Sequence, residues 1–277
     1  MTEGNFPREK DQKSSQFVRI ILVCLSLGLI LIWLINTPPG LLGKSDAIAY
    51  AVCHRIPSHS FGFGERPFSL CARCSGQYLG FFWGFGVHLW LAKKKSGFPS
   101  RWVLAIFFVL FLVFLLDGIN SVLHLYPGLE KWSVYEPQNA VRLFTGLGMG
   151  IVISSVLYPL LGQTLWREFS PDNALSKFRE WAILFMGAIL IGLSVLSENP
   201  LITYPLILFS TGGLLVLLTL LYSIIWILIL KKENSFESWG QLAWWGIAGF
   251  SSALFQIAVI DLTRYLITGT WNGFLDY

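Results

Sequence analysis

The sequence contains few charged residues. Asp, Glu, Lys and Arg together make up 13% of the 277 residues, whereas a soluble globular domain has about 25%. Apolar residues make up 54% and gather in runs of about 20 residues, the length that a helix needs to cross a ~30 Å hydrocarbon core. A soluble core helix could account for one such run but not for so many. The composition therefore predicts an integral membrane protein.

Several other signatures are absent from the sequence. The alternating pattern of a membrane barrel is missing, no small-residue cleavage site follows the first apolar run, and no internal repeat indicates an inverted-repeat transporter. The chain also lacks a phosphate-binding glycine loop and an HExxH motif. The net charge of +4 does not indicate nucleic-acid binding, because the basic residues lie between the apolar runs. We therefore expect helical spans in a lipid bilayer, a retained first helix and no nucleic-acid partner.

Seven membrane spans are predicted from the apolar runs. They cover about residues 18–36, 70–92, 102–118, 138–161, 181–198, 204–230 and 241–267. Cytoplasmic loops carry an excess of Lys and Arg, and a cytoplasmic N-terminus places most of the 20 basic residues inside. The outer side then holds Lys44, Arg55, Arg66, Arg73, Lys131, Arg142 and Arg264. The prediction is an all-α, polytopic transmembrane helix bundle of the cell membrane, with its N-terminus in the cytoplasm and its C-terminus outside.

The chain divides into three predicted regions. Residues 1–17 form a cytoplasmic N-terminal tail. Residues 18–161 contain the first four spans and an outer loop at 37–70 that is rich in cysteine and histidine. Residues 162–277 form an additional membrane region with the last three spans.

Ionisable residues at the outer ends of the spans indicate a functional site, because burying a charge in lipid is costly. Arg142 lies inside the fourth span, and Asp117 and Asn139 lie at the outer ends of the third and fourth. We expect them to share one outward-facing site with the outer cysteines. A purely structural alternative is an ion pair of Arg142 with Asp117 or Glu136 that stabilises the bundle.

Three of the four cysteines lie close together in the sequence. Cys53 precedes the pair Cys71 and Cys74 by a gap in the high teens, which is usual for zinc loops. Either His54 or His59 offers a fourth ligand. Neighbouring residues of an extended chain point to opposite sides, so simple geometry favours His59. The remaining cysteine, Cys24, is predicted to be a small core residue of the first span.

Two other chemistries are open to the same cysteines. A helix N-terminus and the nearby Arg73 would favour the thiolate of Cys71, so that the Cys71/Cys74 pair could exchange disulfides with Cys53 as the shuttle thiol. Alternatively, an oxidising compartment would give a structural disulfide with one thiol left over.

Helical geometry assigns faces to two of the spans. Cys71, Cys74 and Tyr78 share one face of the second span, since they are spaced by three and four residues. Small-residue rows let helices pack closely in lipid. Such rows are formed by Gly76, Gly80 and Gly84 on the opposite face, and by Gly146 and Gly150 below Asn139 and Arg142 in the fourth span.

These residues resemble the signature of a known family. The resemblance rests on Cys53-His54-Arg55, Pro57, Ser60-Phe61, Cys71-Ala72-Arg73-Cys74, Gly76, Tyr78 and Gly80, and on Asp117-Gly118, Asn139, Arg142, Thr145 and Gly146. The chain is similar over about residues 47–150 to domain-of-unknown-function family 2085, a group of small prokaryotic membrane proteins. The family pattern matches His54 but has arginine at the position of His59. The resemblance therefore favours His54 as a ligand and implies that both clusters belong to one site.

The sequence thus leads to one main hypothesis of function. Zinc would be held by Cys53, His54, Cys71 and Cys74, and an anionic lipid or isoprenoid-like substrate by Arg55, Arg73 and Arg142. Asp117 would act as an acid or base, with Tyr78 and Asn139 positioning the substrate of a metal-dependent enzyme. If four protein ligands close the zinc site, no catalytic position remains. The protein would then be a transporter, receptor or assembly factor with a structural clamp.

Overall fold

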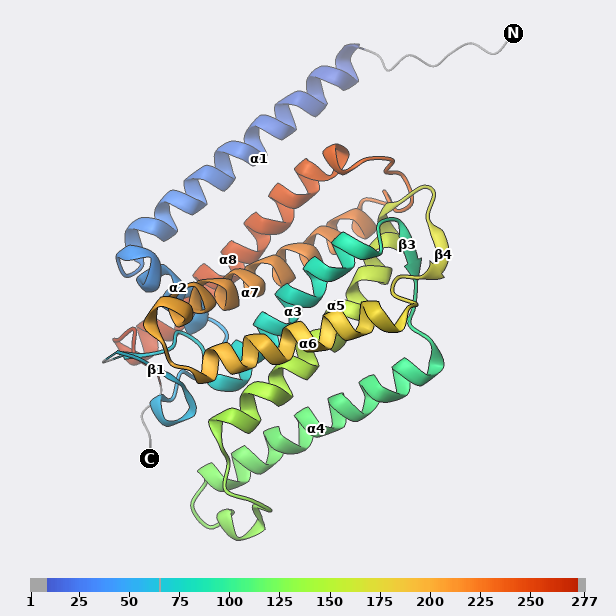
Figure 1. Ribbon diagram of the computed structural model, residues 1–277. Coiled ribbons are helices and arrows are strands. Elements are labelled where there is room, and N and C mark those ends of the chain that lie inside the picture. Colours follow the sequence, from blue (N-terminus) through green and yellow to red (C-terminus); the bar gives the residue numbers. More distant parts are fainter. Residues whose placement is uncertain (1–8, 65, 274–277) are drawn as a thin grey trace.

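The computed structural model describes residues 9–64 and 66–273. Their α-helices are α1 (Glu9–Asn36), α2 (Gly40–Tyr50), α3 (Ala72–Leu91), α4 (Arg101–Leu125), α5 (Asn139–Leu165), α6 (Phe178–Leu196), α7 (Pro200–Ile229) and α8 (Ala243–Thr268). The predicted tail at 1–17 lies partly outside the described residues. In Figure 1, α3 runs through the middle of the bundle, while α1 and α4 lie at opposite margins. The helical class predicted from the sequence is confirmed.

Short strands and 3-10 turns join the helices. Strand β1 (Gly62–Phe63) pairs antiparallel with β2 (Arg66–Pro67), and β3 (Lys95–Gly97) pairs parallel with β4 (Ser170–Asn173). The turns are η1 (Pro57–His59), η2 (Glu130–Trp132) and η3 (Trp239–Leu242). The first pair folds the cysteine-rich loop, and the second joins the α3–α4 connection to the α5–α6 connection.

Among the described residues, six helical segments are long and apolar enough to cross a membrane. They are Arg19–Asn36, Arg101–Leu125, Asn139–Leu165, Phe178–Leu196, Pro200–Ile229 and Trp239–Thr268. They coincide with six of the seven predicted spans and make the chain a multi-pass membrane protein. The other predicted span is helix α3, whose hydropathy is lowered by Arg73, Gln77 and His88. A total of seven spans and the orientation of the termini stay predictions.

Two local elements differ from the prediction. Helix α4 was expected to end near residue 118 but continues to Leu125, because Asn120 and Ser121 are buried and hydrogen-bonded instead of ending the helix. Helix α2 was not predicted, since its 11 residues are too few to form an apolar span. It places the start of the cysteine-rich loop against α7 and α8.

Helices α3 and α5 touch through their backbones, as their glycine rows predict. A Cβ atom on Gly76 would lie 2.2 Å from the carbonyl oxygen of Leu143, and one on Gly146 would lie 2.2 Å from that of Arg73. No side chain fits in either place. This contact sets the polar N-terminal turns of the two helices beside each other.

Cys24 is exposed on α1, so its prediction as a core residue was wrong. Helix α1 packs chiefly against α8, and Cys24 faces away from that contact.

The predicted division of the chain into two membrane regions near residue 161 stays a prediction. Helix α7, from the second region, packs against α3 of the first.

Candidate functional site

Three of the four cysteines, Cys53, Cys71 and Cys74, meet in space. Cys53 follows α2, Cys71 caps the N-terminus of α3, and Cys74 lies in the first turn of that helix. Their Sγ atoms all lie within 4.8 Å of one another, and none is in a disulfide. A tetrahedral zinc ion with Zn–S bonds of about 2.3 Å separates its sulfur ligands by roughly 3.8 Å. The cluster therefore fits a metal ion after a small inward movement.

Hydrogen bonds converge on the sulfur atom of Cys53. The backbone N–H groups of Cys71 and Arg55 donate to this Sγ over 3.3 and 3.5 Å. Hydrogen bonds with the side chains of Cys71 and Cys74 hold the pKa of Cys53 well below its usual range. These donors favour the thiolate, which is the form that binds metals and attacks electrophiles.

His54 lies beside the cysteine cluster but is not one of its members. The backbone N–H of Ile56 donates to His54 Nδ1 over 3.0 Å, so a neutral ring carries its proton on Nε2. Burial and the charges of Arg142, Arg73 and Arg264 lower the pKa of His54, outweighing the opposite effect of Cys53. The ring of His59 is edge-on to that of His54 at 5.3 Å. A role for His54 as the fourth ligand stays a prediction.

Arg264 of α8 holds the backbone that carries the first thiol. Its Nη1 donates to the carbonyl oxygens of Tyr50 and Cys53 over 2.6 and 2.7 Å, and its guanidinium lies 4.0 Å from the centre of the Tyr50 ring. The Tyr50 hydroxyl bonds in turn to Thr268 and to the carbonyl of Thr270. The C-terminal end of α8 is thereby fastened to the loop before Cys53.

Arg55 is also part of this attachment. Its Nη2 lies 3.0 Å from Asp46 Oδ1, and its Nη1 donates to the carbonyl of Trp271 over 2.9 Å. The backbone φ of Arg55 is 55°, a left-handed conformation that a non-glycine residue seldom adopts. Asp46 also binds Arg66 at 2.5 Å. Arg55, predicted to bind substrate, therefore already has a carboxylate partner.

Asp117 accepts bonds from three neighbouring elements and is 2% exposed. Arg73 Nε donates to its Oδ2 over 3.1 Å, and Arg73 Nη2 bonds to the same oxygen and to the backbone carbonyl. The Tyr135 hydroxyl donates to Oδ1 over 2.5 Å, and Thr145 to Oδ2. The alternative ion pair of Arg142 with Asp117 is thus wrong, because Arg73 occupies that carboxylate.

Tyr135 lies in the α4–α5 loop and is held there by Asn120. The Asn120 side chain accepts from the backbone of Val134 and donates to the carbonyl of Tyr135. Partial burial and the hydrogen bond to Asp117 raise the pKa of Tyr135 to about 12. Its phenol therefore stays a proton donor to the carboxylate throughout the physiological range.

Arg142 is buried, with 5% of its surface exposed, yet it takes part in none of the ion pairs between described residues. Its Nη1 donates to Asn139 Oδ1 over 2.8 Å, and its Nε to Ser121 Oγ over 3.4 Å. Both partners are neutral, so the Arg142 guanidinium makes no direct ion pair with a carboxylate. Of the three arginines predicted to bind an anion, Arg55 and Arg73 each pair with a carboxylate, whereas Arg142 does not.

Asn139 and Tyr78 connect these features to the cysteine loop. The Asn139 amide donates to the carbonyls of Ser58 and Ser60 over 3.0 and 3.2 Å. Tyr78 packs against the cluster that contains Cys53 and Cys71, as the shared helix face predicts. Cys53, Cys71 and Cys74 and the polar ends of α4 and α5 therefore form one continuous region.

Sequence reasoning marks Arg264 as a charged residue inside a predicted span, which indicates a functional site, but assigns it no role. It missed two residues of this region, Asp46 and Tyr135. Asp46 and Tyr135 lie in connecting segments of ordinary composition, where no pattern marks them.

Comparison with known proteins places the same region in a family. The pattern of the family described as "Predicted membrane protein (DUF2085)" matches residues 53–156. An uncharacterized protein of Methanocaldococcus jannaschii is 26% identical over 125 residues, which are 44% of this chain and 72% of that protein. An uncharacterized protein of Methanothermobacter thermautotrophicus is 31% identical over 113 residues, 40% of this chain and 90% of the relative. No solved structure matches the chain.

Proposed function

We propose, for a chain that belongs to the DUF2085 family of predicted membrane proteins, that Cys53, Cys71 and Cys74 bind one zinc ion at a membrane surface. The single observation that carries this proposal is the convergence of three free thiols within 4.8 Å. All three lie in the segment that matches the family.

The donor set favours zinc among the common metals. Thiolates are soft ligands that select Zn²⁺, Cu⁺ or iron–sulfur clusters over Mg²⁺ and Ca²⁺. Three cysteine ligands leave a fourth position, which His54 would close or a water or substrate would occupy. An open position would let the ion act as a Lewis acid on a bound substrate.

Arg142 supplies the second half of the proposed site. A guanidinium forms paired hydrogen bonds with phosphate or carboxylate, and that of Arg142 is buried without a carboxylate partner. The membrane setting makes an anionic lipid or isoprenoid-like substrate the fitting class. Tyr78 and Asn139 would position it, while Asp117 keeps Arg73 and Tyr135 in place. The proposal is therefore a metal-dependent enzyme that acts on such a substrate.

Metal analysis of the purified protein, combined with thiol titration, tests the metal site. We expect one zinc per chain, which is lost in each of Cys53→Ser, Cys71→Ser and Cys74→Ser. Cys24→Ser is the matched control and keeps its zinc, because Cys24 is exposed on α1. Removal of the zinc by a chelator should make three further thiols react in the titration. A wild-type protein that takes up no zinc when reconstituted would refute the proposal.

Calorimetry with an isoprenyl diphosphate tests the anion site in the zinc-loaded protein. We expect Arg142→Gln to weaken binding at least tenfold, about 1.4 kcal/mol. Arg101→Gln, at the exposed start of α4, should bind like the wild type. Equal affinities of the wild type and Arg142→Gln would remove Arg142 from the site.

A thiol–disulfide oxidoreductase is the second candidate, favoured by the lowered pKa of Cys53. Two substrate thiolates would react in turn with a protein disulfide between Cys53 and Cys71 or Cys74. The first attacks this disulfide, forms a mixed disulfide and releases the Cys53 thiolate, which leaves readily because its pKa is lowered. The second attacks the mixed disulfide, so that a substrate disulfide forms and the other protein thiol is released, a transfer of two electrons from the substrate to the protein that the quinone then accepts. A zinc-free protein with a reversible disulfide, reoxidised by a quinone, would favour this candidate over the zinc site.

A further inference from the structure

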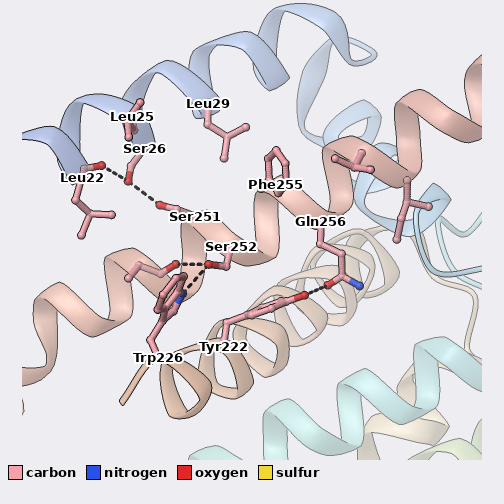
Figure 2. A pocket seen from close by; sticks show the side chains of 13 residues that line it. Leu22, Leu25, Ser26, Leu29, Tyr222, Trp226, Ser251, Ser252, Phe255 and Gln256 are labelled. Carbon is pink, nitrogen blue, oxygen red and sulfur yellow. Dashed lines mark hydrogen bonds between the residues drawn. The ribbon is translucent and has the colours of Figure 1, made fainter. Parts of the chain in front are cut away.

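A second feature lies away from the cysteines, within the membrane-spanning part of the molecule. Helices α1, α7 and α8 enclose a groove of about 560 Å³. Figure 2 shows α8 as its floor, with side chains of α1 and α7 on either side. Leu22, Leu25 and Leu29 of α1 and Phe255 of α8 line it.

The polar side chains around the groove are bonded to one another. Ser26 and Ser251 share a hydrogen bond of 2.6 Å, which joins α1 to α8. On the other side, Trp226 Nε1 donates to Ser252 Oγ and Tyr222 donates to Gln256 Oε1, each over 2.9 Å (Figure 2). The groove is left with a mainly hydrocarbon lining, which suits an apolar ligand better than a polar one.

The length of the groove corresponds to one leaflet of a bilayer. Its lining on α8 runs from Ala248 to Ile260, which is about 18 Å along a helix. Half of the ~30 Å hydrocarbon core is about 15 Å. A single hydrocarbon chain that enters from one surface would therefore fill the groove along its length.

The volume argues against a neighbouring helix as the occupant. A helix about 10 Å wide would occupy roughly 1,400 Å³ over the same ~18 Å. The whole empty space of the groove, its open side included, is about 1090 Å³. A second copy of this chain could cover the groove but could not fill it with a helix.

A positive charge lies at the end of the groove nearest the N-terminus of α1. The Arg19 guanidinium lies 5.2 Å from the centre of the Trp244 ring, and Arg19 is one helical turn before Leu22. Tryptophan is enriched where membrane meets water, and arginine binds phosphate through paired hydrogen bonds. The positive charge and the apolar groove are therefore placed to match the phosphate and the hydrocarbon chain of a phospholipid.

We propose that this groove binds an acyl chain of an anionic phospholipid, from the leaflet that faces the N-terminus of α1, with Arg19 on the lipid phosphate. The site is separate from the cysteine cluster, which lies where α2 leads toward α3. Lipid binding and zinc binding are therefore independent of each other.

Native mass spectrometry of the full-length protein tests the chain site. The protein is equilibrated with vesicles of phosphatidylglycerol or of phosphatidylcholine and then extracted in detergent. Ala248→Phe fills the groove and should lower the retained phosphatidylglycerol at least tenfold. Ala243→Phe makes the same change on the same helix outside the groove and should retain lipid like the wild type. Leu25→Phe narrows the groove from α1 and should also lower retention.

The headgroup site is tested by Arg19→Gln. The wild type should retain more phosphatidylglycerol than phosphatidylcholine. In Arg19→Gln the ratio of the two retained lipids should fall about fivefold, while the variant still retains lipid. Arg101→Gln is the control for loss of a basic residue at another helix start.

Three results would overturn the proposal. They are equal lipid retention by Ala248→Phe and Ala243→Phe, equal retention of the two lipids by the wild type, and a dimer that disappears in Ala248→Phe without loss of lipid. The melting temperature in detergent, measured on the same samples, should be similar in all variants and reports that they are folded. A failure of the zinc proposal would leave the lipid result unchanged.

Discussion

Arg264 donates a hydrogen bond to the carbonyl of Cys53 across 2.7 Å, although the two residues are 211 positions apart. The bond joins α8, outside the segment that matches the family, to the first thiol of the cysteine cluster. Arg264 is therefore a positioning residue for the proposed metal site. The last predicted span therefore contributes to that site even though it holds none of its thiols.

Replacing Arg264 should weaken zinc binding without removing a ligand. Partners that orient metal ligands typically change metal affinity 10–100-fold, so we expect Arg264→Gln to lower zinc affinity at least tenfold in a chelator competition. Arg264→Lys should restore part of the affinity, because an ammonium can still donate to the carbonyls of Tyr50 and Cys53. Unchanged affinity in Arg264→Gln would show that the loop holds its shape without this contact.

Removing the charge of Asp117 should destabilise the bundle. Breaking a buried ion pair by changing one partner costs about 3–5 kcal/mol, and Asp117 is almost fully buried beside Arg73. We expect Asp117→Asn to lower the free energy of unfolding by about 3 kcal/mol in a denaturant titration. The double variant Arg73→Met/Asp117→Leu should recover much of this loss, because no unpaired charge remains. Additive losses in the double variant would contradict this explanation.

A single methyl group on the α3 glycine row should be harmful. In Gly76→Ala the new Cβ would lie 2.2 Å from the backbone oxygen of Leu143, so the helices must separate, at a cost of about 1–3 kcal/mol. Gly86→Ala is the matched control in the same helix, since nothing lies within 4 Å of its Cβ position. Thermal unfolding in detergent measures both, and equal melting temperatures would exclude the close contact.

The hydrogen bond from Tyr135 to Asp117 should depend on pH only in the alkaline range. The folded pKa of Tyr135 is raised to about 12, above the ordinary value of about 10. The stabilisation is therefore complete below about pH 10 and is lost as the pH rises through about 12. The stability difference between the wild type and Tyr135→Phe should be constant up to about pH 10 and then decrease. A difference that decreases below that pH would place the titrating group elsewhere.

Local patterns predicted the helices and one side of the candidate site. A run of apolar residues is a property of one segment, so most of the spans were found within a few residues of their observed ends, except the start of α1 and the end of α4. The Cys71–Cys74 spacing and the face shared with Tyr78 follow from helical periodicity alone. The glycine rows at Gly76 and Gly146 also predicted that each helix lets a neighbour approach closely, but not that α3 and α5 are the partners.

The sequence by itself determined a helical membrane protein with thiols, guanidiniums and carboxylates near one end of its helices. Only the tertiary structure decided which of these groups are paired. Arg73 binds Asp117 from 44 positions away, whereas Arg142 has only neutral partners, and Cys24 faces outward from α1. The physical reason is that composition and periodicity fix one helix at a time. The partner of a charged side chain depends on which helices pack together and at what rotation.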